Sequence, residues 1–85
     1  MSNANWPTEA LSWSFFRRSE EPDLYCAVPV TCSVPRFLLS GHWNFSGQMP
    51  DERAPSGFRL AAALESEHLN GFYLFQLVAG NDVTA

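Results

Sequence analysis

Apolar side chains occupy both faces of the stretch from Asn70 to Gly80. The side chains of a strand alternate between its two faces, so an extended chain here would carry two apolar faces. They consist of Phe72, Leu74 and Val78 on one side and Tyr73, Phe75 and Leu77 on the other. A strand with one face in water alternates apolar with polar residues instead. The pattern therefore predicts a strand that is covered on both sides, either central in its sheet or at a subunit interface.

A different pattern, strict alternation, runs through residues 11–18. Apolar residues such as Trp13 and Phe15 alternate with serines, which predicts a half-buried strand whose serines point outward. Residues 19–23 contain a proline and acidic residues that favour a reversal of the chain. We expect residues 24–30 to form the returning strand of a hairpin.

The middle of the chain predicts a third strand followed by a loop. Residues 36–47 are rich in apolar and aromatic side chains, and we expect a strand there with a kink at Gly41. Prolines at 29 and 35 leave the connection before this strand undetermined. Residues 48–57 contain two prolines and three charges without periodicity, so we expect an exposed loop.

Two interpretations compete for residues 58–69. A helix is favoured by three consecutive alanines and by Glu65 and Glu67, because alanine and glutamate are good helix formers and are depleted in strands. Its predicted apolar stripe consists of Leu60, Ala61, Leu64 and His68. The alternative is a strand that pairs with residues 72–78, since the Asn-Gly dipeptide between the two segments is typical of tight hairpins. We prefer the helix, which the same glycine would end in a left-handed conformation.

Together these elements predict an α+β fold, a small antiparallel sheet of about four strands with one helix packed on it. We expect a single domain over residues 6–80, with flexible termini at 1–5 and 81–85. A chain of 85 residues is large enough for one hydrophobic core of modest stability.

Composition narrows the class of protein. Hydrophobic residues make up 46% of the chain, which excludes an intrinsically disordered protein. Charged residues make up only 16%, so some apolar surface is expected to contact a protein partner or a second copy of the chain. The net charge of −4 and the lack of a basic stripe argue against nucleic-acid binding.

Location and source are also suggested by the sequence. No apolar run is long enough for a membrane span and no signal-peptide pattern is present, so we expect a cytoplasmic protein that does not bind membranes. Cys26 and Cys32 are then expected to be buried thiols without a disulfide bond. Lysine and isoleucine, which have AT-rich codons, are both absent, which suggests a GC-rich bacterial genome.

No group of residues forms a known catalytic or metal-binding motif. Glu65 and His68 lie three apart, the spacing found in carboxylate-bridged metal sites, but such sites need two copies of the pair. Cys26 or Cys32 with His42 would supply a nucleophile and a base, but no local motif supports that pairing. We therefore expect no catalytic residue, no metal ligand and no cofactor.

The feature that indicates a function is the set of three tryptophans, two tyrosines and seven phenylalanines. The cores of interfaces are enriched in Trp, Tyr and Arg, so we predict a non-enzymatic protein–protein interaction module: an adaptor, an inhibitor or an assembly subunit, with a homodimer expected. The candidate binding residues are Arg36, His42, Trp43, Arg53 and Tyr73. The alternative is a small-molecule-binding or enzymatic domain with a cleft under the 48–57 loop and with His42, Trp43 and Arg53 at its mouth.

Overall fold

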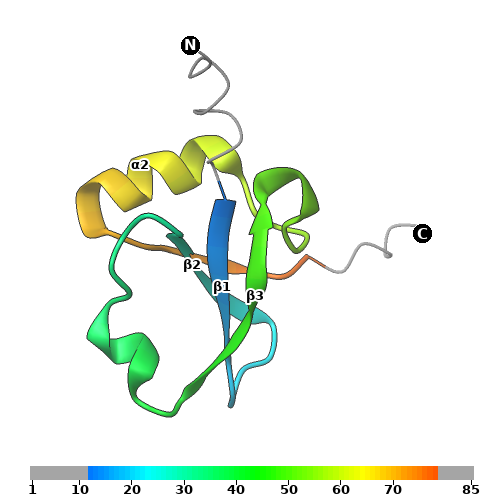
Figure 1. Cartoon of the computed structure of the whole chain (residues 1–85). Helices are drawn as coiled ribbons and strands as arrows, with labels where there is room; N and C mark the ends of the chain where they lie inside the picture. Colours follow the sequence, from blue (N-terminus) through cyan, green and yellow to red (C-terminus); the bar gives the residue numbers. More distant parts are fainter. Residues whose placement is uncertain (1–11, 79–85) are drawn as a thin grey trace, which may run out of the picture.

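A four-stranded antiparallel sheet forms the centre of the computed structural model, which describes residues 12–78 (Figure 1). The strand order is β3-β1-β2-β4. The elements are β1 (Ser12–Arg18), β2 (Leu24–Pro29), the 3₁₀ helix η2 (Arg36–Leu39), β3 (Trp43–Pro50), the 3₁₀ helix η3 (Asp51–Arg53), α2 (Leu60–Asn70) and β4 (Tyr73–Gln76). The predicted α+β fold is confirmed. The expected termini at 1–5 and 81–85 and the ends of the expected domain at 6 and 80 lie outside the described residues.

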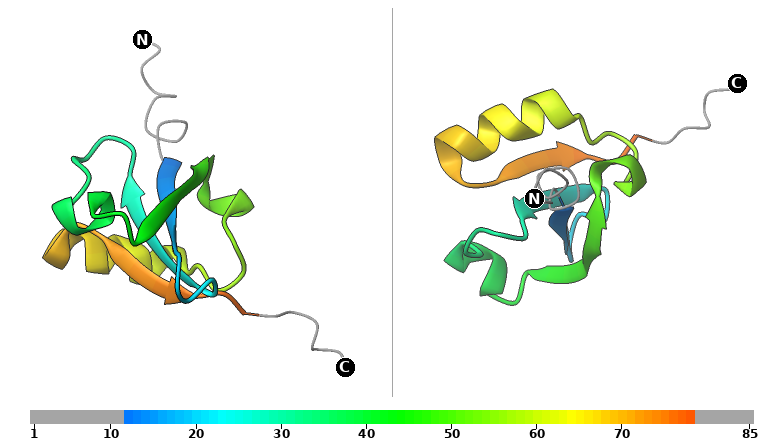
Figure 2. Two further views of the ribbon diagram at one scale, coloured as in Figure 1. Left: turned by 90° about the horizontal axis from the view of Figure 1, so that it is seen from below. Right: turned by 45° about the horizontal axis from the view of Figure 1, so that its top comes forward.

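Each face of the sheet carries its own hydrophobic cluster. Figure 2 (right) shows α2 on one side of the sheet and the segment that contains η2 on the other. The helix-side cluster lies between the sheet and α2, and its buried members are Trp13, Phe15, Tyr25, Ala27, Ala63 and Phe75. The loop-side cluster lies under the segment that contains η2, and its buried members are Phe16, Cys26, Val28, Leu38 and Trp43. The core is therefore divided by the sheet into two layers.

Strand β1 is buried on both faces, which corrects the prediction of a half-buried strand. Ser14 is only 5% exposed although its position in the alternation suggested an outward side chain. Its hydroxyl accepts a hydrogen bond from Nε2 of Gln48 on β3, at 3.1 Å. Phe16, on the same face, is buried as well. A polar side chain is tolerated here because a residue far along the chain satisfies its hydrogen bond.

The third strand begins later and ends later than predicted. Arg36–Leu39 is a 3₁₀ helix that follows Pro35, and it buries Leu38 against the sheet. The strand starts at Trp43, after Gly41 has taken a positive φ of 101°. It continues to Pro50, so the first residues of the predicted 48–57 loop belong to the sheet.

Residues 60–70 form a helix, and the alternative of a strand in a hairpin is wrong. Gly71 ends the helix with a φ of 89°, the left-handed conformation that glycine adopts without cost. The predicted apolar stripe faces the core only in part, because Leu60 packs against the helix-side cluster but Leu64 does not face it. Ala63 is the buried residue of α2, whereas Leu64 is 43% exposed and Leu69 is 72% exposed.

Strand β4 lies at the edge of the described sheet, so of its two predicted positions the central one is wrong, and a position at a subunit interface stays a prediction. Its helix-side face is covered, and Phe75 is 6% exposed. On the other face Leu74 is 46% exposed, because the segment around η2 does not extend over it. The second apolar face of the predicted strand is therefore surface in this chain.

Candidate interaction surface

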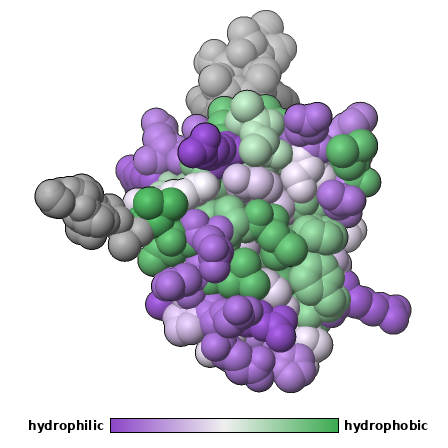
Figure 3. Space-filling model, turned by 180° about the vertical axis from the view of Figure 1, so that it is seen from behind, coloured by the Kyte–Doolittle hydropathy of each residue, from purple (hydrophilic) through white to green (hydrophobic). Residues whose placement is uncertain are grey.

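A groove of about 430 Å³ runs between α2 and β4. It is lined by Ala62, Glu65, Ser66, Leu69, Asn70, Phe72, Tyr73 and Leu74. Figure 3 shows the corresponding side of the molecule, where hydrophobic side chains gather in the middle and hydrophilic residues surround them. The groove is therefore mainly apolar, with a polar border.

The sharp reversal at Gly71 places the two walls of this groove side by side. The N–H of Gly71 donates to the carbonyl of Glu67 at 2.8 Å, which closes the last turn of α2. The hydroxyl of Ser66 donates to the carbonyl of Phe72 at 2.7 Å. Helix α2 and strand β4 thus run antiparallel and are joined by a short turn. Side chains from both elements therefore line the space between them.

The outer edge of β4 is open only in its middle. The N–H of Leu77 donates to Asp23 on the β2 side, so by alternation the backbone groups of the even-numbered residues point away from β2. The Phe72 carbonyl is occupied by Ser66 as described above. At the other end, the N–H of Val78 donates to the carbonyl of Ser56 at 3.1 Å, and Gly57 lies directly against the Gln76 carbonyl. Leu74 and the N–H of Gln76 remain between these two closed ends.

Four apolar residues form a continuous patch beside the groove. Leu69 and Leu74 are 72% and 46% exposed, and both line the groove with Phe72. The ring of Phe72 contacts that of Phe37 on η2, with centroids 5.0 Å apart, and Phe37 is 38% exposed. We name this patch of Phe37, Leu69, Phe72 and Leu74, together with the α2–β4 groove, the β4 surface.

Two of the five sequence-predicted binding residues lie at or next to the β4 surface. Tyr73 lines the groove, and Arg36 is exposed on η2, directly before Phe37. Trp43 is 9% exposed in the loop-side cluster, so it lies on the opposite face of the sheet from Tyr73. The guanidinium of Arg18 covers its ring at 5.5 Å.

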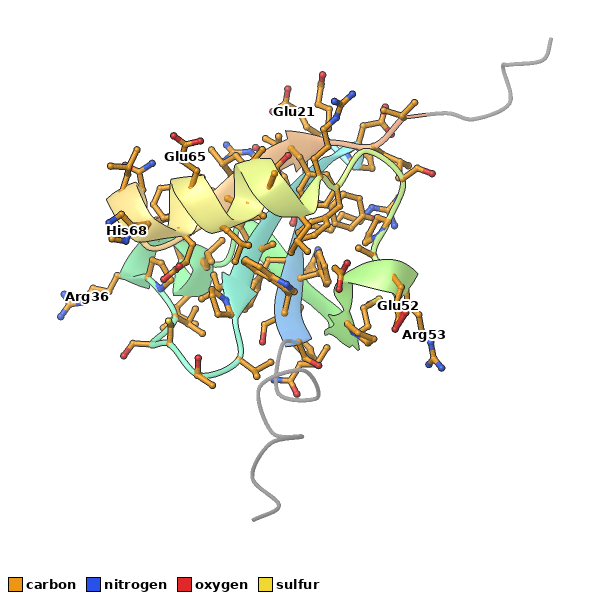
Figure 4. All side chains as sticks on the ribbon, turned by 90° about the horizontal axis from the view of Figure 1, so that it is seen from above. Glu21, Arg36, Glu52, Arg53, Glu65 and His68 are labelled. Atoms are coloured by element: carbon orange, nitrogen blue, oxygen red, sulfur yellow. The ribbon has the colours of Figure 1, made fainter. Side chains whose placement is uncertain are left out.

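The remaining two predicted residues do not join them. His42 is exposed, with its Nδ1 3.8 Å from a carboxylate oxygen of Glu20. Arg53 is exposed on η3, and Figure 4 shows it at the opposite end of the molecule from Arg36. The five residues therefore do not converge on one site.

Sequence reasoning missed Leu69, Phe72 and Leu74 as surface residues. Single exposed leucines are common in proteins and carry no signal by themselves. The available signal was the second apolar face of residues 72–78, for which the sequence predicted a cover without specifying whether that cover belongs to this chain or to a partner.

The cysteines differ in their surroundings, and the prediction that both are buried is wrong for Cys32. Cys26 is fully buried, and Cys32 is exposed with its Sγ 3.8 Å from Oε2 of Glu67. Neither is in a disulfide bond. Burial raises the pKa of the Cys26 thiol to about 12, against a smaller lowering by a backbone hydrogen bond with Tyr73. Cys26 is therefore protonated at neutral pH, which is the wrong state for a nucleophile.

Among residues 12–78, no group of three or more His, Cys, Asp or Glu side chains lies close enough together to hold a metal ion.

In the 48–57 segment, Met49 and Ala54 pack against the helix-side cluster. No helix in the described part of the chain has the length and apolar character needed to cross a membrane.

The chain was compared with protein-family models, with curated proteins and with solved structures, and none of the three comparisons gave a significant match.

Proposed function

We propose that this protein is a non-enzymatic binding module, an adaptor, inhibitor or assembly subunit, that docks another protein chain on the β4 surface. The observation that carries the proposal is the combination of an apolar groove with exposed leucines at its rim, Leu69 at 72% and Leu74 at 46%. Exposed apolar patches that are bordered by polar residues are typical of protein interaction sites.

The packing of α2 supports this proposal. An 11-residue helix gains most of its stability from burying an apolar stripe. In α2, Ala63 is buried and Leu60 packs on the core, whereas Leu64 and Leu69 are exposed. A partner that covers this helix would remove apolar surface from water, and each Å² removed would contribute about 25 cal/mol of favourable free energy. The free energy of docking would then stabilise the helix as well.

The closed ends of β4 indicate how a partner docks. Strand addition needs a row of free backbone groups along an edge. Beside β4, Ser66 occupies the Phe72 carbonyl and Ser56 occupies the Val78 N–H. Gly57 covers the Gln76 carbonyl, so only a short run of free groups at Leu74 and the Gln76 N–H is left. Packing of side chains into the groove is therefore favoured over extension of the sheet.

An enzymatic domain with a cleft under residues 48–57 has less support. Met49 and Ala54 of that segment pack on the core, and Trp43 is buried in the cluster on the loop side of the sheet. The buried thiol of Cys26 has a pKa of about 12, which does not suit nucleophilic catalysis. A cytoplasmic location and a bacterial source stay predictions.

Selection of peptides on the purified protein tests the proposed surface. We expect a displayed random-peptide library to yield binders that lose at least about tenfold in affinity when Leu74→Asp or Leu69→Asp is introduced. Leu39→Asp is the matched control, because Leu39 is 68% exposed on η2 and does not line the groove. Absence of binders, or binders that respond equally to all three variants, would refute the proposal.

A further inference from the structure

The charged side chain that lines the groove of the β4 surface is acidic, although Arg36 lies directly before Phe37 of the same surface. Residues 60–78 contain Glu65 and Glu67 but no lysine or arginine. Glu65 lines the groove, and Figure 4 shows its side chain directed away from α2 into solvent. Arg59 and Arg36 flank this stretch in the fold, but neither lines the groove. An apolar groove with an acidic rim suits a partner with positive charge.

The same distribution argues against a second copy of the chain as the occupant. A two-fold dimer brings the same patch of both copies together, so Glu65 of each copy would enter one interface. The stretch that forms the groove supplies no lysine or arginine to compensate them. Like charges placed together in an interface are destabilising.

Backbone hydrogen bonding distinguishes a helical from an extended occupant. An extended segment that lies along β4 would find only a short run of free outward groups, at Leu74 and the Gln76 N–H, because Ser66 occupies the Phe72 carbonyl, Gly57 covers the Gln76 carbonyl and Ser56 occupies the Val78 N–H. A helix satisfies its own backbone groups and needs only side-chain contacts. Helices of this kind present apolar anchors at i, i+3, i+4 and i+7 to a hydrophobic groove.

We infer that the β4 surface binds a cationic amphipathic helix of another protein, with apolar anchors against Leu69, Phe72 and Leu74 and a Lys or Arg beside Glu65. This inference rests on the proposed function and specifies the class of partner. It departs from the homodimer expected from composition alone.

The test uses two fluorescent probe peptides of about 14 residues, long enough for amphipathic helices that fold on binding. One is built of leucine and lysine in a helical apolar pattern, and the other has glutamate in place of every lysine. Fluorescence polarisation with the full chain measures both affinities at low and at high salt. We expect the leucine–lysine peptide to bind, with weaker binding at high salt, and the leucine–glutamate peptide not to bind.

Two charge-reversal variants locate the binding. Glu65→Lys is expected to lower the affinity for the leucine–lysine peptide about tenfold. A charge beside an apolar anchor both attracts the peptide and fixes its position in the groove. Glu52→Lys is the matched control: Glu52 is exposed on η3 and lies away from Glu65 in Figure 4. Both substitutions change the net charge of the protein by the same amount. The control therefore measures how far the general negative charge of the protein attracts the peptide. We expect it to weaken binding less than about twofold.

Three results would overturn the inference and leave the proposed function standing, provided that binding or association still depends on Leu74. They are equal or absent binding of the two probe peptides, equal weakening by Glu65→Lys and Glu52→Lys, and a stable dimer in analytical ultracentrifugation that Leu74→Asp dissociates. If neither peptide binding nor self-association responds to Leu74→Asp or Leu69→Asp, the proposed function fails together with the inference.

Discussion

The backbone of Gly57 lies so close to the carbonyl oxygen of Gln76 that a Cβ on Gly57 would clash with that oxygen. Gly57 also has a φ of +106°, a conformation that residues with a side chain rarely adopt. The contact seats the turn before α2 on the edge strand β4. It thereby closes one end of that edge, next to the hydrogen bond between the Val78 N–H and Ser56.

We expect Gly57→Ala to lower the free energy of unfolding by about 2–4 kcal/mol. The positive φ alone costs about 1–2 kcal/mol, and displacement of the strand by the added methyl group costs a similar amount. Gly41→Ala separates the two effects, because Gly41 has a φ of +101° but no atom within 4 Å of its Cβ position. Urea denaturation of both variants measures the difference, and equal losses would show that the close contact does not contribute.

The two faces of β4 are predicted to differ strongly in their response to truncation. Phe75 is 6% exposed and stacks on the rings of Tyr25 and Tyr73, with centroids at 5.5 and 5.4 Å. We expect Phe75→Ala to cost about 3–5 kcal/mol of stability, the range for a buried phenylalanine. Its neighbour Leu74 is 46% exposed, so Leu74→Ala is expected to cost less than about 1.5 kcal/mol. Similar losses in thermal or urea unfolding would mean that both faces of the strand are covered.

The sequence correctly predicted the elements that depend on residues close together in the chain. The alanine run and the Asn-Gly reversal correctly predicted α2 and its end at Gly71. Burial of Ser14 depends instead on Gln48, which lies 34 residues along the chain and donates to its hydroxyl. The position of β4 at an edge likewise depends on which strands pair, and an apolar pattern does not specify this.

The sequence predicted only part of the candidate surface, because exposure also depends on residues far apart in the chain. The search for aromatic and arginine residues correctly selected Tyr73 and Arg36, which lie at or beside the β4 surface. They also gave Trp43, which is buried against the sheet. Whether an apolar side chain faces a core or a partner is decided by how far the covering segments extend. Here the segment around η2 covers Cys26 but not Leu74, its cross-strand neighbour.

Phe37 is predicted to hold the η2 segment on the sheet. Its ring contacts Trp43 at 5.9 Å and Phe72 at 5.0 Å, so it spans from the start of β3 to the residue before β4. We expect Phe37→Ala to cost about 1–3 kcal/mol, because Phe37 makes two edge-to-face pairs that are worth about 0.5–1.5 kcal/mol each. Amide hydrogen exchange should also become faster at Leu38 and Ser40, whose N–H groups bond within this segment.

Leu39→Ala is the control for Phe37→Ala. Leu39 belongs to the same 3₁₀ helix but is 68% exposed, so its truncation removes little buried area and should leave stability within about 0.5 kcal/mol. If both variants exchange at the rate of the unchanged protein, the contacts of Phe37 do not hold the segment.

Cys26 makes the stability of the protein sensitive to alkaline pH. Burial raises the pKa of its thiol from 9.0 to about 12, so between these values the unfolded chain releases a proton that the folded chain retains. Folding is then disfavoured as pH rises, by up to about 1.4 kcal/mol per pH unit, whereas below pH 9 both states are protonated and the contribution is constant. Urea unfolding at several pH values between 9 and 12 measures this slope. Cys26→Ala should flatten this slope, whereas Cys32→Ala should not, because Cys32 is exposed. An identical slope in both variants would show that groups other than Cys26 cause the loss of stability at alkaline pH.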